Sequence, residues 1–229
     1  MELRDPDTDI INESCIKLID AKIKIHYTIE YGETVESGDI DDCNIVGNCM
    51  ETILYPYLKD KIPTLEKGPL QKSPDFYNRN KQYDWELKTF CKSPNFDIAN
   101  YTSYITQLSE NLNKKLYKTQ YLVFKYEIKN DYIIIKDFVL CNVWNIVSYD
   151  KTYPISLQNK KGTWYNIRPC CFKDMKKNKT AKKFINNLIK SINECPNNIE
   201  NKESIINKIN DQYNTDVDTL THLIEDVKI

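Results

Sequence analysis

The chain has 229 residues, of which 41% are hydrophobic and 28% charged, and its formal net charge at pH 7 is −1. A chain of this size and composition can bury a full core, and its charge excludes a protein that holds nucleic acid by bulk positive charge. It has no apolar run near the roughly 20 residues of a membrane span, and its start lacks the features of a secretory signal. We therefore expect a single domain over residues 1–229 that stays in the cytoplasm, away from membranes.

Cysteine and histidine usage narrows the chemistry. The eight cysteines contain no C-x-x-C pair, which is the usual spacing of a zinc site. We therefore expect reduced and partly buried thiols. The two histidines, His26 and His222, lie far apart in the sequence. This argues against hydrolases and nucleases that depend on a placed imidazole.

Helical spacing dominates the start of the chain. Apolar residues recur at this spacing over residues 8–22, with Asp9 as a plausible cap, and a helix is expected there. Residues 22–31 alternate between apolar and polar, which fits either a strand or a continuation of the helix. Residues 32–42 are acidic and indicate an exposed loop. A second helix is predicted over residues 44–61.

The middle of the chain is rich in strand signals. Two aromatic, strand-prone arms surround turn residues at 78–81, which predicts a β-hairpin over residues 73–90. The later elements are a helix over 97–117, strands over 120–128 and 132–140, a strand near 164–167, and helices over 181–193 and 201–227. This order predicts a mixed α/β, or α+β, domain with a central mixed sheet.

The hairpin carries acidic side chains at a useful spacing. If its arms pair, Asp75 and Glu86 meet, and a period of two places Asp84, Glu86 and Lys88 on one face. The other face, toward the core, then carries Tyr83, Trp85 and Leu87. Two carboxylates suit Mg²⁺, which can promote phosphodiester hydrolysis, and Lys88 could place the attacking water. Asp84 would crowd Glu86, so we expect it to support the site from behind or to be exposed.

The same segment resembles the PD-(D/E)xK nuclease superfamily. Its motif is present as Pro74-Asp75, ten intervening residues, and then Glu86-Leu87-Lys88. Similar patterns occur at residues 6–7 with 20–22 and at residues 127–129. The first lies in a helix-patterned stretch and the second lacks a nearby Pro-Asp, so we reject both. Only residues 73–90 combine the motif with two strand-like arms and a following helix.

Many restriction enzymes of this superfamily carry a glutamate on the helix before the hairpin, and Glu51 occupies that position. The resemblance implies Mg²⁺ as cofactor, with Mn²⁺ as a substitute. It implies metal binding by Asp75, Glu86, Glu51 and the backbone carbonyl of Leu87. The implied catalytic residues are Asp75, Glu86, Lys88 and Glu51.

The overall plan resembles a type II restriction endonuclease, with a catalytic core over residues 44–140 and a helical part over residues 173–229. The resemblance implies sequence-specific cleavage of double-stranded DNA by a homodimer without a nucleotide cofactor. A repair or recombination nuclease would share the motif. A non-catalytic DNA-binding or interaction domain is the third alternative, and it predicts that Asp75 and Glu86 point apart.

Residues that contact DNA are less clearly marked. Arg79 and Asn80 lie at the hairpin turn, within reach of a phosphate. Residues 159–169 mix basic, aromatic and amide side chains, which suits contacts to phosphates and base edges. The candidates there are Lys161, Asn166 and Arg168. A hairpin tip that packs its aromatics on the core explains this segment equally well, and the basic run over 173–183 fits a solvated face as well as a DNA contact.

Overall fold

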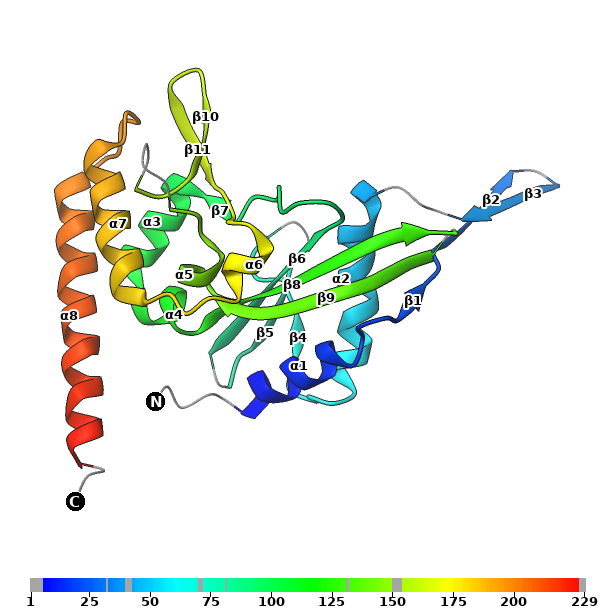
Figure 1. The fold of residues 1–229 in the computed structure, drawn as a ribbon, viewed down its shortest axis with the longest axis horizontal. Helices are drawn as coiled ribbons and strands as arrows, with labels where there is room; N and C mark the ends of the chain where they lie inside the picture. The colour runs from blue at the N-terminus through cyan, green and yellow to red at the C-terminus, as the bar shows by residue number, and fades with distance from the viewer. Residues whose placement is uncertain are drawn as a thin grey trace. The chain divides into compact units, whose positions relative to one another are not determined.

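The structure is a computed structural model that describes residues 6–31, 33–39, 43–69, 72–80, 82–130, 132–149 and 154–226 (Figure 1). Its contacts divide the chain into two compact units. Unit 1 comprises Met1–Phe96 and Gln120–Cys141, and unit 2 comprises Asp97–Thr119 and Asn142–Ile229. A single domain over residues 1–229 stays a prediction, because such units occur within one domain as well as in two.

Unit 1 contains the predicted central sheet, which has six strands in the order β1-β9-β8-β6-β5-β4. Their bounds are β1 Lys22–Ile23, β9 Tyr132–Asn142, β8 Thr119–Lys129, β6 Tyr83–Phe90, β5 Phe76–Asn78 and β4 Glu66–Lys67. The hairpin β5–β6 and the strands β8 and β9 form close to where the sequence predicts them. β4 was not predicted, because two residues are too short for a pattern.

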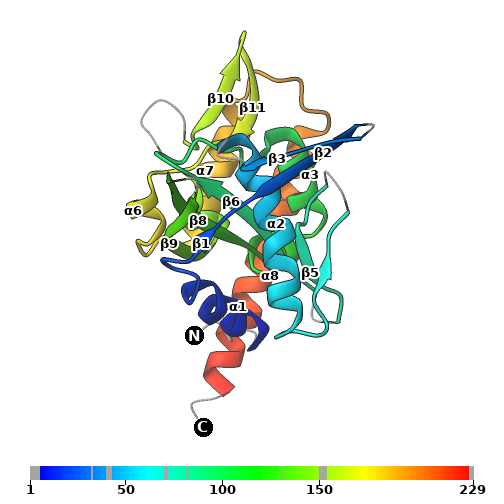
Figure 2. The same ribbon diagram turned by 90° about the vertical axis from the view of Figure 1, so that its right-hand side faces the viewer.

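Helix α2 (Cys43–Lys59) packs on β6, and Figures 1 and 2 show it lying along the sheet. Four of its apolar residues recur every fourth position and are buried: Val46, Met50, Leu54 and Leu58. This stripe joins the core cluster of the sheet. The apolar face predicted for this helix includes Leu54 and Leu58, which are in the core, but also Cys49 and Ile53, which are only half-buried. Tyr55 stacks on Phe76 of β5, with ring centroids 6.3 Å apart. This contact places α2 beside the start of β5, the strand that directly follows Pro74-Asp75.

The turn of the hairpin β5–β6 begins one residue later than predicted. Asn78 belongs to β5 and is only 1% exposed. Its amide donates to the carboxylate of Asp7, at 2.6 Å, and to the hydroxyl of Thr64, at 2.9 Å. Asp7, which belongs to the rejected motif at residues 6–7, is itself buried. It therefore anchors the hairpin from α1 (Pro6–Ile16).

Asn78→Ala is expected to lower the free energy of unfolding by about 1.5–3 kcal/mol, because it leaves the buried Asp7 carboxylate without this donor. Urea unfolding measures the change. Asn80→Ala is the matched control, since Asn80 is exposed in the same turn and its loss should cost less than about 0.5 kcal/mol. Equal effects of the two changes would contradict the anchoring role of Asn78.

The N-terminal segment departs from its prediction. The helix over 8–22 is wrong at both ends, because α1 starts at Pro6 and stops at Ile16, so Asp9 lies inside it. Asp20 takes a left-handed φ of 66° and donates its N–H to Ile135, which starts the sheet instead. Of the two alternatives for residues 22–31, the structure has strands: β1 and β2 (His26–Tyr31). The expected loop is wrong where β3 (Thr34–Asp39) pairs with β2, and residues 32 and 40–42 lie outside the described residues.

Unit 2 combines helices with a three-stranded sheet of order β10-β11-β7. The strands are β7 Ala99–Asn100, β10 Leu157–Lys160 and β11 Thr163–Ile167. The helices are α3 Tyr101–Glu110, α4 Leu112–Leu116, α5 Val143–Ile146, α6 Phe172–Met175, α7 Ala181–Glu194 and α8 Lys202–Asp226. Strand β11 and helices α7 and α8 lie where they were predicted. None of the helices in the described ranges is long and apolar enough to cross a membrane.

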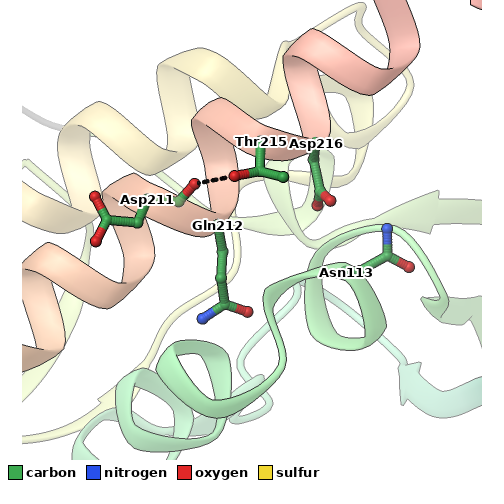
Figure 3. A pocket seen from close by; sticks show the side chains of 5 residues that line it. All are labelled: Asn113, Asp211, Gln212, Thr215 and Asp216. Atoms are coloured by element: carbon green, nitrogen blue, oxygen red, sulfur yellow. Dashed lines mark hydrogen bonds between the residues drawn. The ribbon is translucent and has the colours of Figure 1, made fainter.

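The single helix predicted over 97–117 is wrong, because Asn111 breaks it. Asn100 caps α3, and Asn111, with φ −149°, ends α3 and caps α4. Gln212 of α8 bridges the break: its amide donates to the Ser109 carbonyl at 2.6 Å and accepts from the Leu112 N–H at 3.0 Å. Figure 3 shows Gln212 in a pocket between α4 and α8. The Gln212 amide therefore stabilises the break between α3 and α4.

The cysteines in the described part of the chain form no disulfide. Seven cysteines there are free, and four of them are buried: Cys15, Cys141, Cys170 and Cys195. Burial raises the pKa of Cys15 above its usual range, and an apolar environment keeps such a thiol protonated. Cys15 therefore acts as a small apolar side chain, whereas the Cys170 thiol donates to the Asn145 carbonyl and accepts from the Lys179 ammonium.

Candidate active site

The hairpin register brings Asp75 and Glu86 together. Phe76 pairs with Trp85 in the antiparallel ladder, so one further step places Asp75 opposite Glu86. Phe76 and Trp85 are fully buried in the core cluster, which leaves the neighbouring pair on the other face. Continued by one step, the register sets Asp75 across from Glu86, and the convergence of the two carboxylates on one metal ion stays a prediction.

Leu87 is tied to Asp75 through its backbone. The Leu87 N–H donates to Asp75 Oδ2 at 2.6 Å. In an extended strand the N–H and C=O of one residue point to the same side, so the Leu87 carbonyl also points toward the segment that carries Asp75. The residue opposite Leu87 in the continued register is Pro74, which has no N–H to donate to that carbonyl. Pro74 therefore leaves the Leu87 carbonyl oxygen available beside the carboxylates.

Glu86 is buried, with 8% of its surface exposed, and Ser73 donates a short hydrogen bond from Oγ to Glu86 Oε1. Asp84, two residues earlier, is also 8% exposed and pairs in register with Tyr77. The predicted alternative in which Asp84 is exposed is therefore wrong. Strand β6 lies between two neighbouring strands and is covered on both faces.

Three charged side chains surround Asp75. Burial raises the pKa of Asp75, and the hydrogen bond from the Leu87 N–H opposes that rise. The negative charge of Glu51 on α2 raises the pKa further, whereas Lys88 and Lys67 lower it. The charges of Glu51 and Lys88 therefore act on Asp75, while their predicted places in the catalytic site and their roles stay predictions.

Lys67 was missed by sequence reasoning, because it reaches the site through the short strand β4. Lys67 pairs with Phe76 in register, and the next residue, Gly68, donates its N–H to the Asp75 carbonyl at 2.8 Å. A Cβ on Gly68 would lie 1.6 Å from the Pro74 carbonyl oxygen. Only glycine allows the two backbones to approach this closely, so Gly68 helps to fix Asp75.

The donors at this site suit a hard cation. Mg²⁺ takes oxygen ligands and is usually held by one or two carboxylates, with water and substrate phosphate in the remaining positions. Asp75, Glu86 and the Leu87 carbonyl are donors of this kind. In the described part of the chain, no three His, Cys, Asp or Glu side chains form a metal cage. Glu51 as a metal ligand therefore stays a prediction.

Arg79 and Asn80, predicted to contact DNA, are exposed at the hairpin turn. Arg79 donates to the Tyr77 hydroxyl at 3.0 Å and lies 3.4 Å from the Glu66 carboxylate. The Asn80 N–H donates to the Asn78 side chain and stabilises the turn. Arg79 is thus already paired with an acid, although its side chain is 73% exposed.

The other predicted DNA contacts lie on the β10–β11 hairpin of unit 2. Asn166 and Arg168 both contact Asp97, which forms an ion pair with the arginine. Lys161 is exposed at the hairpin tip, with a left-handed φ of 52°. Trp164 is buried against Tyr101, so one aromatic packs on the core as the alternative reading expects.

Comparison with known proteins gives one consistent result. The model of the NgoBV restriction endonuclease family matches residues 10–224. The type II restriction enzyme NlaIV of Neisseria lactamica is 33% identical over 145 residues, with 58% of each chain covered. The solved structure of NlaIV restriction endonuclease has a TM-score of 0.76 at 23% identity, and the match covers 92% of this chain and 89% of that one. The match confirms the predicted mixed α/β fold with a central sheet flanked by helices.

Proposed function

Because this chain belongs to the NgoBV restriction endonuclease family, we propose that it is a type II restriction endonuclease that hydrolyses phosphodiester bonds at specific sites in double-stranded DNA. The observation that supports the proposal is the hairpin register, whose continuation sets Asp75 across from Glu86, together with the charge of Lys88 that acts on Asp75. We propose further that the enzyme depends on Mg²⁺ and acts as a homodimer. Sedimentation of the purified chain with and without duplex DNA tests the dimer.

The chemistry of each site residue suits it to a different role in the reaction. Asp75, Glu86 and the Leu87 carbonyl would hold the cation, which when bound supplies positive charge to the phosphate and lowers the pKa of a bound water. Lys88 brings its ammonium next to Asp75, where it can orient the water and stabilise the negative charge that builds on the phosphate oxygens. The Leu87 N–H fixes the Asp75 carboxylate in place.

The test is incubation with unmethylated phage DNA in Mg²⁺, in Mn²⁺ or in chelator, followed by a gel. Discrete bands that need the metal support the proposal, whereas a smear would indicate a nuclease without sequence specificity. Glu86→Gln should stop cleavage. Glu127→Gln, which alters the rejected motif at residues 127–129, is the matched control and should cut normally. The proposal fails if no DNA is cut in either metal.

The tip of the β10–β11 hairpin is the part of unit 2 proposed to contact DNA. Figure 1 shows it extending past the ends of α3 and α7. Lys160 and Lys161 are exposed there, and Tyr165 is 41% exposed with the Lys160 ammonium 5.6 Å from its ring. An exposed aromatic beside a cation, with a second exposed lysine at the same tip, suits contact with a phosphate backbone and the bases beside it. Arg168 is a weaker candidate, because Asp97 already neutralises it.

Replacing both Lys160 and Lys161 by Gln is expected to weaken DNA binding and to lower its salt dependence. Each lost phosphate contact reduces the slope of log affinity against log salt by about 0.9. Titration of labelled duplex at several salt concentrations, without metal, measures the slope. The control replaces Lys129 and Lys208, two exposed lysines elsewhere. An unchanged slope in the Lys160/Lys161 variant would remove the tip from the DNA interface.

A further inference from the structure

The segment before the motif contains a residue that contacts the second carboxylate. Ser73 is exposed and directly precedes Pro74-Asp75, and its hydroxyl donates to Glu86 Oε1. One short segment therefore carries both Asp75 and the group that contacts Glu86. In the ladder, the same segment lies across from β6, so the bond crosses the hairpin at the candidate site.

We propose that Ser73 is a positioning residue that orients the Glu86 carboxylate for the metal, an inference that rests on the proposed function. A glutamate has a long side chain with several rotatable bonds, and fixing it on binding costs conformational entropy. A hydrogen bond made beforehand removes part of this cost. The bond engages one carboxylate oxygen and so restricts the orientations of the other.

The proposal predicts an effect on metal binding that is larger than the effect on folding. Hydrogen bonds to metal-binding side chains typically change metal affinity by about 10–100-fold when they are lost. Because Ser73 is exposed, its replacement by Ala leaves no cavity, although it removes one hydrogen bond from the buried Glu86 carboxylate. Ser73→Ala should therefore fold, with a melting temperature lowered by no more than the loss of one hydrogen bond explains.

Mn²⁺ titration without DNA, followed by electron paramagnetic resonance, tests the proposal. Ser73→Ala should weaken Mn²⁺ binding by about 10–100-fold, and Ser73→Thr, which keeps the hydroxyl, should restore it. In cleavage, Ser73→Ala should raise the Mg²⁺ concentration for half-maximal rate and leave the rate at saturating Mg²⁺ nearly unchanged. Ser103→Ala is the matched control, because Ser103 is an exposed serine whose hydroxyl bonds only to Gln107 among the interactions described.

The possible results separate the two proposals. If the unaltered protein and Ser73→Ala bind Mn²⁺ equally well, Ser73 has no positioning role and the proposed function stands. If Ser73→Ala weakens binding equally in a Glu86→Gln background, the effect does not pass through Glu86 and the inference is overturned. If Mn²⁺ binding survives Asp75→Asn, the metal site itself is misplaced and both proposals fail.

Discussion

Asp75→Asn is expected to slow DNA cleavage by roughly a thousandfold or more, because a lost metal ligand removes several kcal/mol of transition-state stabilisation. At neutral pH without metal, the same change is expected to raise the melting temperature. The two effects have one cause. The carboxylate is held in a partly buried place that suits a cation and penalises an unpaired negative charge.

The sign of the stability effect follows from the pKa of Asp75. Burial raises it in the folded protein, and the nearby Glu51 raises it further, so the folded state binds the proton more tightly than the unfolded chain. The resulting stabilisation is complete below the ordinary pKa of an aspartate, about 3.9, and is lost as the pH rises through the raised value. At neutral pH the ionised carboxylate therefore destabilises the fold. An uncharged amide, which can still accept from the Leu87 N–H, does not.

Thermal unfolding in chelator between pH 3 and pH 8 measures this prediction. The gain from Asp75→Asn should be largest at neutral pH and disappear toward pH 3. Mg²⁺ should raise the melting temperature of the unaltered protein and leave that of the variant unchanged. Asp174→Asn is a control of opposite sign, since a hydrogen bond from Lys177 and another from Cys171 lower the pKa of Asp174. A lower melting temperature for Asp75→Asn at neutral pH would contradict the argument.

The sequence predicts those parts of the fold that follow from local periodicity. Helix α2 and strand β6 could be predicted because hydrophobic spacing is a local property of the chain, whereas the burial of both faces of β6 depends on the strands and helix around it. Strand β3 was missed because Thr34–Asp39 has few apolar residues and forms by pairing with β2. The end of α1 was missed because it depends on Asp20, which bonds to Ile135 of β9.

The candidate site shows the same division. Asp75 and Glu86 could be found because a hairpin brings residues of fixed spacing together. Lys67 could not, because its position depends on the two-residue strand β4. The contacts of Asn166 and Arg168 with Asp97 join residues about 70 positions apart, and no local pattern indicates them.

Gly68→Ala is expected to damage stability and activity together, although Gly68 carries no side chain and contacts no substrate. The added Cβ would lie 1.6 Å from the Pro74 carbonyl oxygen and 3.3 Å from that of Asp75, both backbone atoms. Strand β4 must then move away, which breaks the hydrogen bond from the Gly68 N–H to Asp75. Overpacking of this kind costs about 1–3 kcal/mol, and the lost bond about 1 kcal/mol more.

The activity loss should exceed what the stability loss explains. A displacement near 1 Å at a reacting group can lower a rate by about a hundredfold, and Asp75 loses the backbone hydrogen bond from Gly68 that holds it against such a displacement. Cleavage should therefore fall by about this factor at a temperature where urea unfolding shows Gly68→Ala still folded. Gly47→Ala is the control, since its Cβ would meet Thr89 at an ordinary 3.5 Å and alanine favours the helix by up to about 1 kcal/mol. Normal cleavage by Gly68→Ala would mean that β4 does not position Asp75, and the burial and hydrogen bond to Leu87 would have to hold the carboxylate alone.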